Sequence, residues 1–195
     1  MLEDKRLDKD VPIPLYFQLE KLILEEIDKP VVAKIQGAAV GAGLDMALMC
    51  DVRIAAESAT MSESYFNAGI VPGDGGAYFL PRLVGLDKAL DMFWTAKVLK
   101  GAEAERIGLV THVVPDDQLD DYVEQYMQKL LDAPQTAMRL TKRAIYQSEQ
   151  SSLRVSLDMV SSFMGIVTEL DDYRTRTAAL VEKLNKKGKK KPSKN

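Results

Sequence analysis

Apolar residues recur along this chain with two spacings, and each spacing predicts a kind of element. Between residues 15 and 27 they recur every three or four positions, which predicts a helix that ends before Pro30. Short runs rich in β-branched residues predict buried strands instead. These runs lie at 31–35, 52–55 and 110–114.

Helical spacing accounts for most of the remaining chain. The predicted helices lie at 43–49, 76–84, 87–95 and 100–108, from 115 to about 130, from 134 to about 146, and at 153–184 with an interruption near Glu169. Residues 57–76 are rich in glycine and predict a long structured loop. Strands that alternate with helices favour an α/β fold with a helical C-terminal section. The expected segments are a charged loop at 1–14, an α/β core at 15–133, a helical region at 134–185 and a basic disordered tail at 186–195.

Composition narrows the class of protein. The chain has 195 residues, of which 46% are hydrophobic and 28% charged, and its net charge is −3. These values are ordinary for a globular domain and argue against a nucleic-acid partner, since the basic residues concentrate only in the tail. One cysteine and one histidine argue against a disulfide framework and a zinc site, and favour a reducing, cytoplasmic setting. No run of 18 apolar residues predicts a membrane span.

The stretch QGAAVGAGLDMALMCD, residues 36–51, places small residues where a predicted strand meets a predicted helix. A bare backbone lets a ligand approach closely, and the first amides of a helix have no partner within the helix. Two such amides aimed at one oxygen would form an oxyanion hole. Tight packing of helix on strand also selects glycine and alanine, so both interpretations stay open. The spacing matches neither a dinucleotide fingerprint nor a P-loop.

Three motifs extend the picture: KPVVAKIQGAAVGAGLDMALMCDVRIAAESATM, AGIVPGDGGAYFLPRLVG and GLVTHVVPDDQL. In this order they resemble the crotonase superfamily, the enoyl-CoA hydratase/isomerase proteins, over roughly residues 15–185. The resemblance implies a spiral of ββα units with a C-terminal helical trimerisation region, assembled as a trimer or hexamer. It implies an acyl-CoA thioester as substrate. Coenzyme A would arrive as part of that substrate, and no separate cofactor or metal is expected.

The resemblance also assigns residues. Ala42 would donate one amide of the oxyanion hole, and a polarised thioester carbonyl would stabilise an enolate. Residues around this point and in the later glycine loop would contact the substrate: Ala39, Val40, Gly41, Pro72 and Gly73. The second amide belongs to an upstream F-[CS]-A-G-x-D motif, which this sequence does not contain. We therefore expect the chain to lack the N-terminal part of the family.

The acid/base residues depart from the hydratase pattern. Asp45 stands where the family has its first glutamate, and Tyr65 stands where it has the second. Tyrosine is a poor base because its ordinary pKa is near 10. Asp74, in VPGDGG, is a further candidate acid or base, or alternatively a cap of the following helix. Asp45 has a structural alternative too, as an acid placed favourably in the first turn of a helix.

Other polar and aromatic residues are interpreted as structural. Glu63 is expected to be solvated, His112 to end a strand and Cys50 to fill a small space in the core. Met92, Phe93 and Trp94 pack in the core or line an acyl pocket. A last apolar set forms a core or oligomer face: Met159, Phe163, Met164 and Val167.

Three functions remain in view. The first is enoyl-CoA hydration, and the second is double-bond isomerisation or another enolate reaction, which the change to Tyr65 favours. The third is a non-catalytic protein of the same fold that binds CoA esters or RNA.

Overall fold

The protein is described here by a computed structural model that covers residues 27–188. The charged loop at 1–14, most of the helix at 15–27 and the end of the basic tail lie outside the described residues. The chain divides into two compact units, and the boundary along the sequence falls between Leu130 and Leu131. Each unit is considered by itself.

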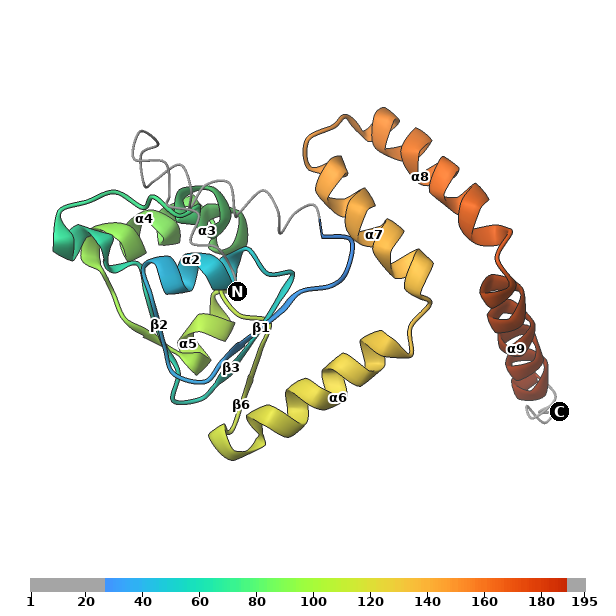
Figure 1. The fold of residues 1–195 in the computed structure, drawn as a ribbon, viewed down its shortest axis with the longest axis horizontal. Helices are drawn as coiled ribbons and strands as arrows, with labels where there is room; N and C mark the ends of the chain where they lie inside the picture. Colours follow the sequence, from blue (N-terminus) through green and yellow to red (C-terminus); the bar gives the residue numbers. More distant parts are fainter. Residues whose placement is uncertain (1–26, 189–195) are drawn as a thin grey trace, which may run out of the picture. The chain divides into compact units, whose positions relative to one another are not determined.

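The first unit contains two small sheets of three strands each. One sheet is parallel and has the order β1 (Val32–Ile35), β3 (Val52–Ala56) and β6 (His112–Val114) (Figure 1). These are the three strands that the β-branched runs predict, and the order of the strands confirms an α/β fold.

The second sheet has the order β2 (Ala38–Val40), β4 (Thr60–Ser62) and β5 (Leu99–Lys100). β2 and β4 pair in parallel, and β4 and β5 pair antiparallel. The sequence pattern missed all three strands. Each has two or three residues, which is too short for an alternation of polar and apolar positions to appear.

A repeat of two strands followed by a helix links the sheets. β1 and β2 lead into α2 (Ala42–Leu48), and β3 and β4 lead through the 3₁₀ turn η1 (Ser64–Ala68) to α3 (Gly76–Val84). The first strands of the two repeats pair with each other in one sheet, and the second strands pair in the other. The prediction of a long loop at 57–76 was therefore wrong, because β4 and η1 lie within it.

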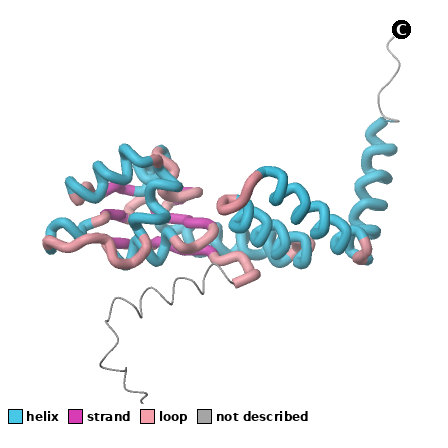
Figure 2. Tube along the Cα trace, turned by 90° about the horizontal axis from the view of Figure 1, so that it is seen from above, coloured by secondary structure: helices cyan, strands magenta, loops and turns pink. Residues whose placement is uncertain are grey.

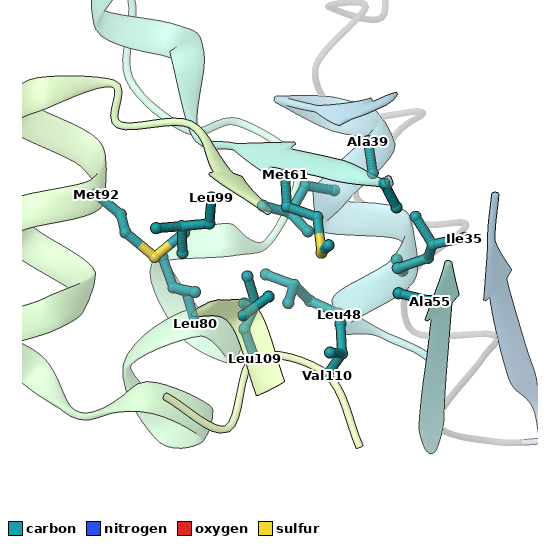
Figure 3. Close-up of a cluster of buried hydrophobic side chains, with 14 of the residues drawn as sticks. Ile35, Ala39, Leu48, Ala55, Met61, Leu80, Met92, Leu99, Leu109 and Val110 are labelled. Carbon is teal, nitrogen blue, oxygen red and sulfur yellow. The ribbon is translucent and has the colours of Figure 1, made fainter. Parts of the chain in front are cut away.

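The core of this unit fills the space between sheets and helices. α4 (Leu86–Thr95) and α5 (Gly101–Arg106) supply further apolar faces. Figure 3 shows side chains from both sheets and from α2, α3 and α4 meeting in one cluster. It includes Ile35, Leu48, Met61, Leu80, Met92, Leu99 and Leu109. This packing holds both ββα repeats in a fixed register.

After β6 the chain becomes helical. A short turn, η2 (Asp116–Gln118), leads into α6 (Leu119–Leu131). The second unit continues with α7 (Gln135–Ser148), α8 (Leu153–Thr168) and α9 (Asp171–Gly188), which Figure 2 draws in cyan. The break predicted near Glu169 is confirmed, since α8 ends at Thr168 and α9 begins at Asp171. Among residues 27–188 no helix is both long and apolar enough to cross a membrane.

Candidate active site

The parallel pairing of β2 with β4 brings two distant parts of the sequence to one edge of a sheet. Val40 is the register partner of Ser62, and the amide of Gly41 donates to the carbonyl of Ser62 over 2.9 Å. Both strands end here. The chain after β2 enters α2, and the chain after β4 enters η1, so the first residues of these segments are neighbours.

Glycine at position 41 allows the abrupt change from strand to helix. Its φ of 53° and ψ of −121° lie in a region that side chains with a Cβ rarely adopt. Ala42 then begins α2 and is exposed, while the amide of Asp45 closes the first turn on the carbonyl of Gly41. The first amides of α2 therefore stand beside the strand ends, as an oxyanion donor at Ala42 requires.

Asp45 lies one turn into α2 and is completely buried. Its Oδ2 lies 2.8 Å from the hydroxyl of Tyr65 on η1, and that hydroxyl lies 3.0 Å from Oδ2 of Asp74. The three polar residues that the sequence singled out from separate motifs thus meet in one place. Asp45 also keeps its favourable position in the first turn of the helix.

Gly76 explains how a carboxylate fits so deep in the unit. A Cβ at this position would lie 3.0 Å from Cγ of Asp45 and closer still to its Oδ1. Any side chain at 76 would collide with the acid. Gly76, the last residue of the VPGDGG motif, therefore leaves the space that Asp45 occupies.

Asp74 is not the N-cap residue of α3. That position belongs to Gly75, which has a φ of 100°, and Asp74 precedes it with a half-buried side chain. The carboxylate turns instead to the hydroxyl of Tyr65. Of the two interpretations of Asp74, the geometry favours the one that places it in the site.

Glu63 is the residue that sequence reasoning missed. Its expected solvated position was wrong, because the side chain is completely buried. Burial, together with the negative charge of the adjacent Asp45, raises the pKa of the Glu63 carboxyl to about 9. The signal that could have revealed this is its position just after a strand. Glu63 directly follows β4, as Gly41 directly follows β2, and an acid in that position must lie near the start of α2.

Tyr65 is a donor in this setting rather than a base. Its side chain is buried, and burial, the hydrogen bond to Asp45 and the nearby acids raise the pKa of its hydroxyl above the ordinary value. The hydroxyl has one proton but two carboxylate neighbours, so it donates to one of them at a time. The other contact is a hydrogen bond only when that carboxyl itself carries a proton.

We call Glu63, Asp45, Tyr65 and Asp74 the acid row. It runs from a buried end at Glu63 to a half-buried end at Asp74. Within residues 27–188 no group of three His, Cys, Asp or Glu side chains is arranged to hold a metal ion. The row can accept, hold and pass protons.

The remaining predicted residues have mixed positions. Ala39 is buried in the core, whereas Val40 is 46% exposed, Pro72 is half-buried and Gly73 is exposed. Met92 and Phe93 pack in the core, but Trp94 is exposed, so these three do not act as one set. His112 begins β6 and stacks edge-on against Tyr122, and Cys50 is half-buried, with its thiol donating to the carbonyl of Met46.

Fold and site together define an α/β protein of two ββα repeats, with the acid row at the edge of its second sheet. Residues 5–191 match the model of the enoyl-CoA hydratase/isomerase family. The chain therefore belongs to this family, and its fold is the crotonase fold.

Individual proteins that resemble this chain support its place in the family. A crotonyl-CoA hydratase of Syntrophomonas wolfei is 35% identical over 161 residues, which are 83% of this chain and 62% of that protein. A 1,2-epoxyphenylacetyl-CoA isomerase of Escherichia coli is 30% identical over 93% of this chain and 72% of its own length. The crystal structure of an enoyl-CoA hydratase from Bacillus anthracis superposes with a TM-score of 0.83 at 33% identity, covering 87% of this chain and 66% of that one. The chain thus spans about three fifths of the curated hydratase it matches.

Proposed function

We propose that this protein transforms acyl-CoA thioesters, with addition of water to a 2-enoyl-CoA as its reaction. The observation that carries the proposal is the contact of buried Asp45 with Tyr65, beside the exposed first residue of α2. The names of the crotonyl-CoA hydratase and enoyl-CoA hydratase relatives support a 2-enoyl-CoA as substrate. Coenzyme A enters as part of the substrate, and no other cofactor takes part.

In this reaction the amide of Ala42 donates to the thioester oxygen and stabilises the negative charge that develops there. The backbone at Gly41 and the exposed Gly73 leave room for the substrate, with Val40 and Pro72 beside them and Ala39 acting through its backbone. Asp45 takes a proton from the attacking water as the C–O bond forms at the β-carbon and the π bond breaks. Asp74 gives a proton to the α-carbon. Tyr65 then returns a proton from Asp45 to Asp74, which restores both acids.

Isomerisation of a 3-enoyl-CoA is the second candidate. Tyr65 occupies the place of the second carboxylate that hydratases use, and its raised pKa makes it unable to serve as a base. A double-bond shift needs only one base, which removes a proton from one carbon and returns it to another. The similarity to a 1,2-epoxyphenylacetyl-CoA isomerase adds weight to this reading.

One assay separates the candidates. Purified protein is incubated with crotonyl-CoA and, separately, with a 3-enoyl-CoA, and the products are resolved by chromatography. We expect hydration of crotonyl-CoA, and we expect Asp74→Asn to lower it by roughly 100-fold or more. Asp91→Asn, an exposed acid on α4, is the matched control. A double-bond shift without hydration would favour isomerisation, and calorimetric binding of acetyl-CoA without any turnover would favour the non-catalytic alternative.

The second unit suggests how copies of the chain assemble. α8 carries a row of exposed apolar side chains, and α9 carries another, while Met159, Phe163 and Val167 are half-buried. The exposed set is Leu153, Val155, Leu157, Val160, Met164, Ile166, Tyr173, Leu180, Val181 and Leu184. Apolar surface of this kind favours burial against another subunit. We propose a homotrimer or hexamer in the cytoplasm without nucleic-acid or membrane partners, to be checked by light scattering after size exclusion.

A further inference from the structure

Glu63 is a buried acid for which the proposed reaction has no direct use. Its side chain is completely buried, and no donor among residues 27–188 reaches either of its carboxylate oxygens. An ionised carboxylate left in this state would be strongly unfavourable, because burial removes water without supplying a donor in its place. The fold must therefore compensate for Glu63 in another way.

Asp45 is the acidic neighbour that determines the protonation state of Glu63. Two ionised carboxylates can only accept hydrogen bonds, so the pair would repel. A single proton turns the contact into a hydrogen bond. Asp45 already lies 2.8 Å from the Tyr65 hydroxyl, which stabilises negative charge on it, whereas Glu63 has no such donor. The proton therefore belongs on Glu63 and the charge on Asp45.

We propose that Glu63 is a positioning residue: a neutral carboxylic acid that donates to Asp45, fixes its orientation and keeps it ionised as the base of the site. The catalytic part of this inference rests on the proposed function. Asp45 is then held between two donors, Tyr65 from η1 and Glu63 from the end of β4, with Gly76 of α3 leaving space for it. At neutral pH the acid row therefore keeps one proton on Glu63 at its buried end, and the proton that takes part in the reaction lies nearer Asp74.

The other charged groups of the neighbouring elements do not supply this role. Beyond the effect of burial, Asp45 is the titratable group whose charge and hydrogen-bonding contact raise the pKa of Glu63, and Glu63 in turn acts on Tyr65. On α3 and α4 the side chains are exposed or engaged elsewhere: Arg82 lies over the ring of Tyr78, Lys88 donates to the carbonyl of Val84, and Asp87 and Asp91 are exposed. Asp74 contacts the hydroxyl of Tyr65, which in turn contacts Asp45. A proton is thus what balances Glu63.

The kinetic test compares Glu63→Ala, Glu63→Gln and the exposed control Glu57→Gln. Glutamine keeps the shape of a protonated glutamate and can still donate, whereas alanine cannot. We expect Glu63→Ala to lower kcat at pH 7 by roughly 10-fold or more with KM little changed, because Asp45 loses its orientation. Glu63→Gln should recover part of this loss. The wild type should lose activity as Glu63 ionises near pH 9, and Glu63→Gln should lack that decline.

A second readout does not require turnover. Infrared difference spectra of wild type against Glu63→Gln at pH 7 should show the carbonyl band of one protonated carboxyl in the wild type only. Absence of this band, or a pH profile unchanged in Glu63→Gln, would overturn the inference. If the band is present but no enoyl-CoA is converted, the proposed function fails while the neutral Glu63 stands.

Discussion

A neutral buried Glu63 has a consequence for stability that can be worked out from its surroundings. The ordinary pKa of a glutamate is 4.5, and the folded protein raises that of Glu63 to about 9. Between these values the native state holds one proton more than the unfolded state. The free energy of unfolding therefore falls as pH rises across this window, by about 1.4 kcal/mol for each pH unit.

Glu63→Gln removes this dependence because an amide does not titrate. From pH 6 to pH 8 the wild type should lose about 3 kcal/mol of unfolding free energy relative to the variant. Urea titrations followed by the fluorescence of Trp94, the single tryptophan and part of the same unit, would measure the difference. Glu57→Gln, which alters an exposed acid, should run parallel to the wild type. Parallel curves for Glu63→Gln as well would show that Glu63 is ionised in the folded protein.

Three further substitutions test neighbouring parts of the structure. Tyr65→Phe removes the donor between Asp45 and Asp74 and should cost about 1–3 kcal/mol of unfolding free energy in urea titrations. Tyr78→Phe, on the exposed face of α3, should cost far less, and equal values would show that the Tyr65 hydroxyl does not bind the two acids. Gly76→Ala forces a methyl group against Asp45 and should lower the free energy of unfolding by about 1–3 kcal/mol, measured by thermal or urea unfolding. Gly73→Ala has open space around it, so its free energy of unfolding should stay close to that of the wild type. Arg53→Met leaves the carbonyls of Cys50 and Leu109 without their donor and should cost about 1–3 kcal/mol by the same measurement, and a neutral result would show that these bonds do not hold the end of α2.

Local sequence pattern was a good guide wherever an element is long enough to have one. The strands β1, β3 and β6 followed from short runs rich in β-branched residues, and the boundaries of α3 followed from helical apolar spacing. β2, β4 and β5 were invisible to the same reasoning. Their few residues are held by pairing with each other, and pairing depends on parts of the chain that are far apart in sequence.

The candidate site likewise contains residues that the sequence identifies and one, Glu63, that only the structure reveals. Asp45 and Tyr65 stand out because they occupy the places of the family's two glutamates, and Asp74 because it lies in the glycine turn VPGDGG. That the three side chains meet follows only from the structure. Glu63 does not stand out, since its neighbours Ser62 and Ser64 are polar and suggest a solvated turn. Its burial follows from the register that sets Ser62 beside Val40 and so directs the next residue toward α2. Glu63 is therefore buried because of the pairing between β2 and β4, which the residues next to it in the sequence do not indicate.

Turnover of an enoyl-CoA by Asp45→Asn tests directly whether Asp45 is the base of the reaction. Asparagine keeps the size of the side chain and can still contact Tyr65, but it cannot take a proton. We predict that kcat on crotonyl-CoA falls by roughly 100- to 10,000-fold while binding of the thioester, measured by calorimetry, is retained. Turnover by Asp45→Asn equal to that of the wild type would show that this buried carboxylate is not the base.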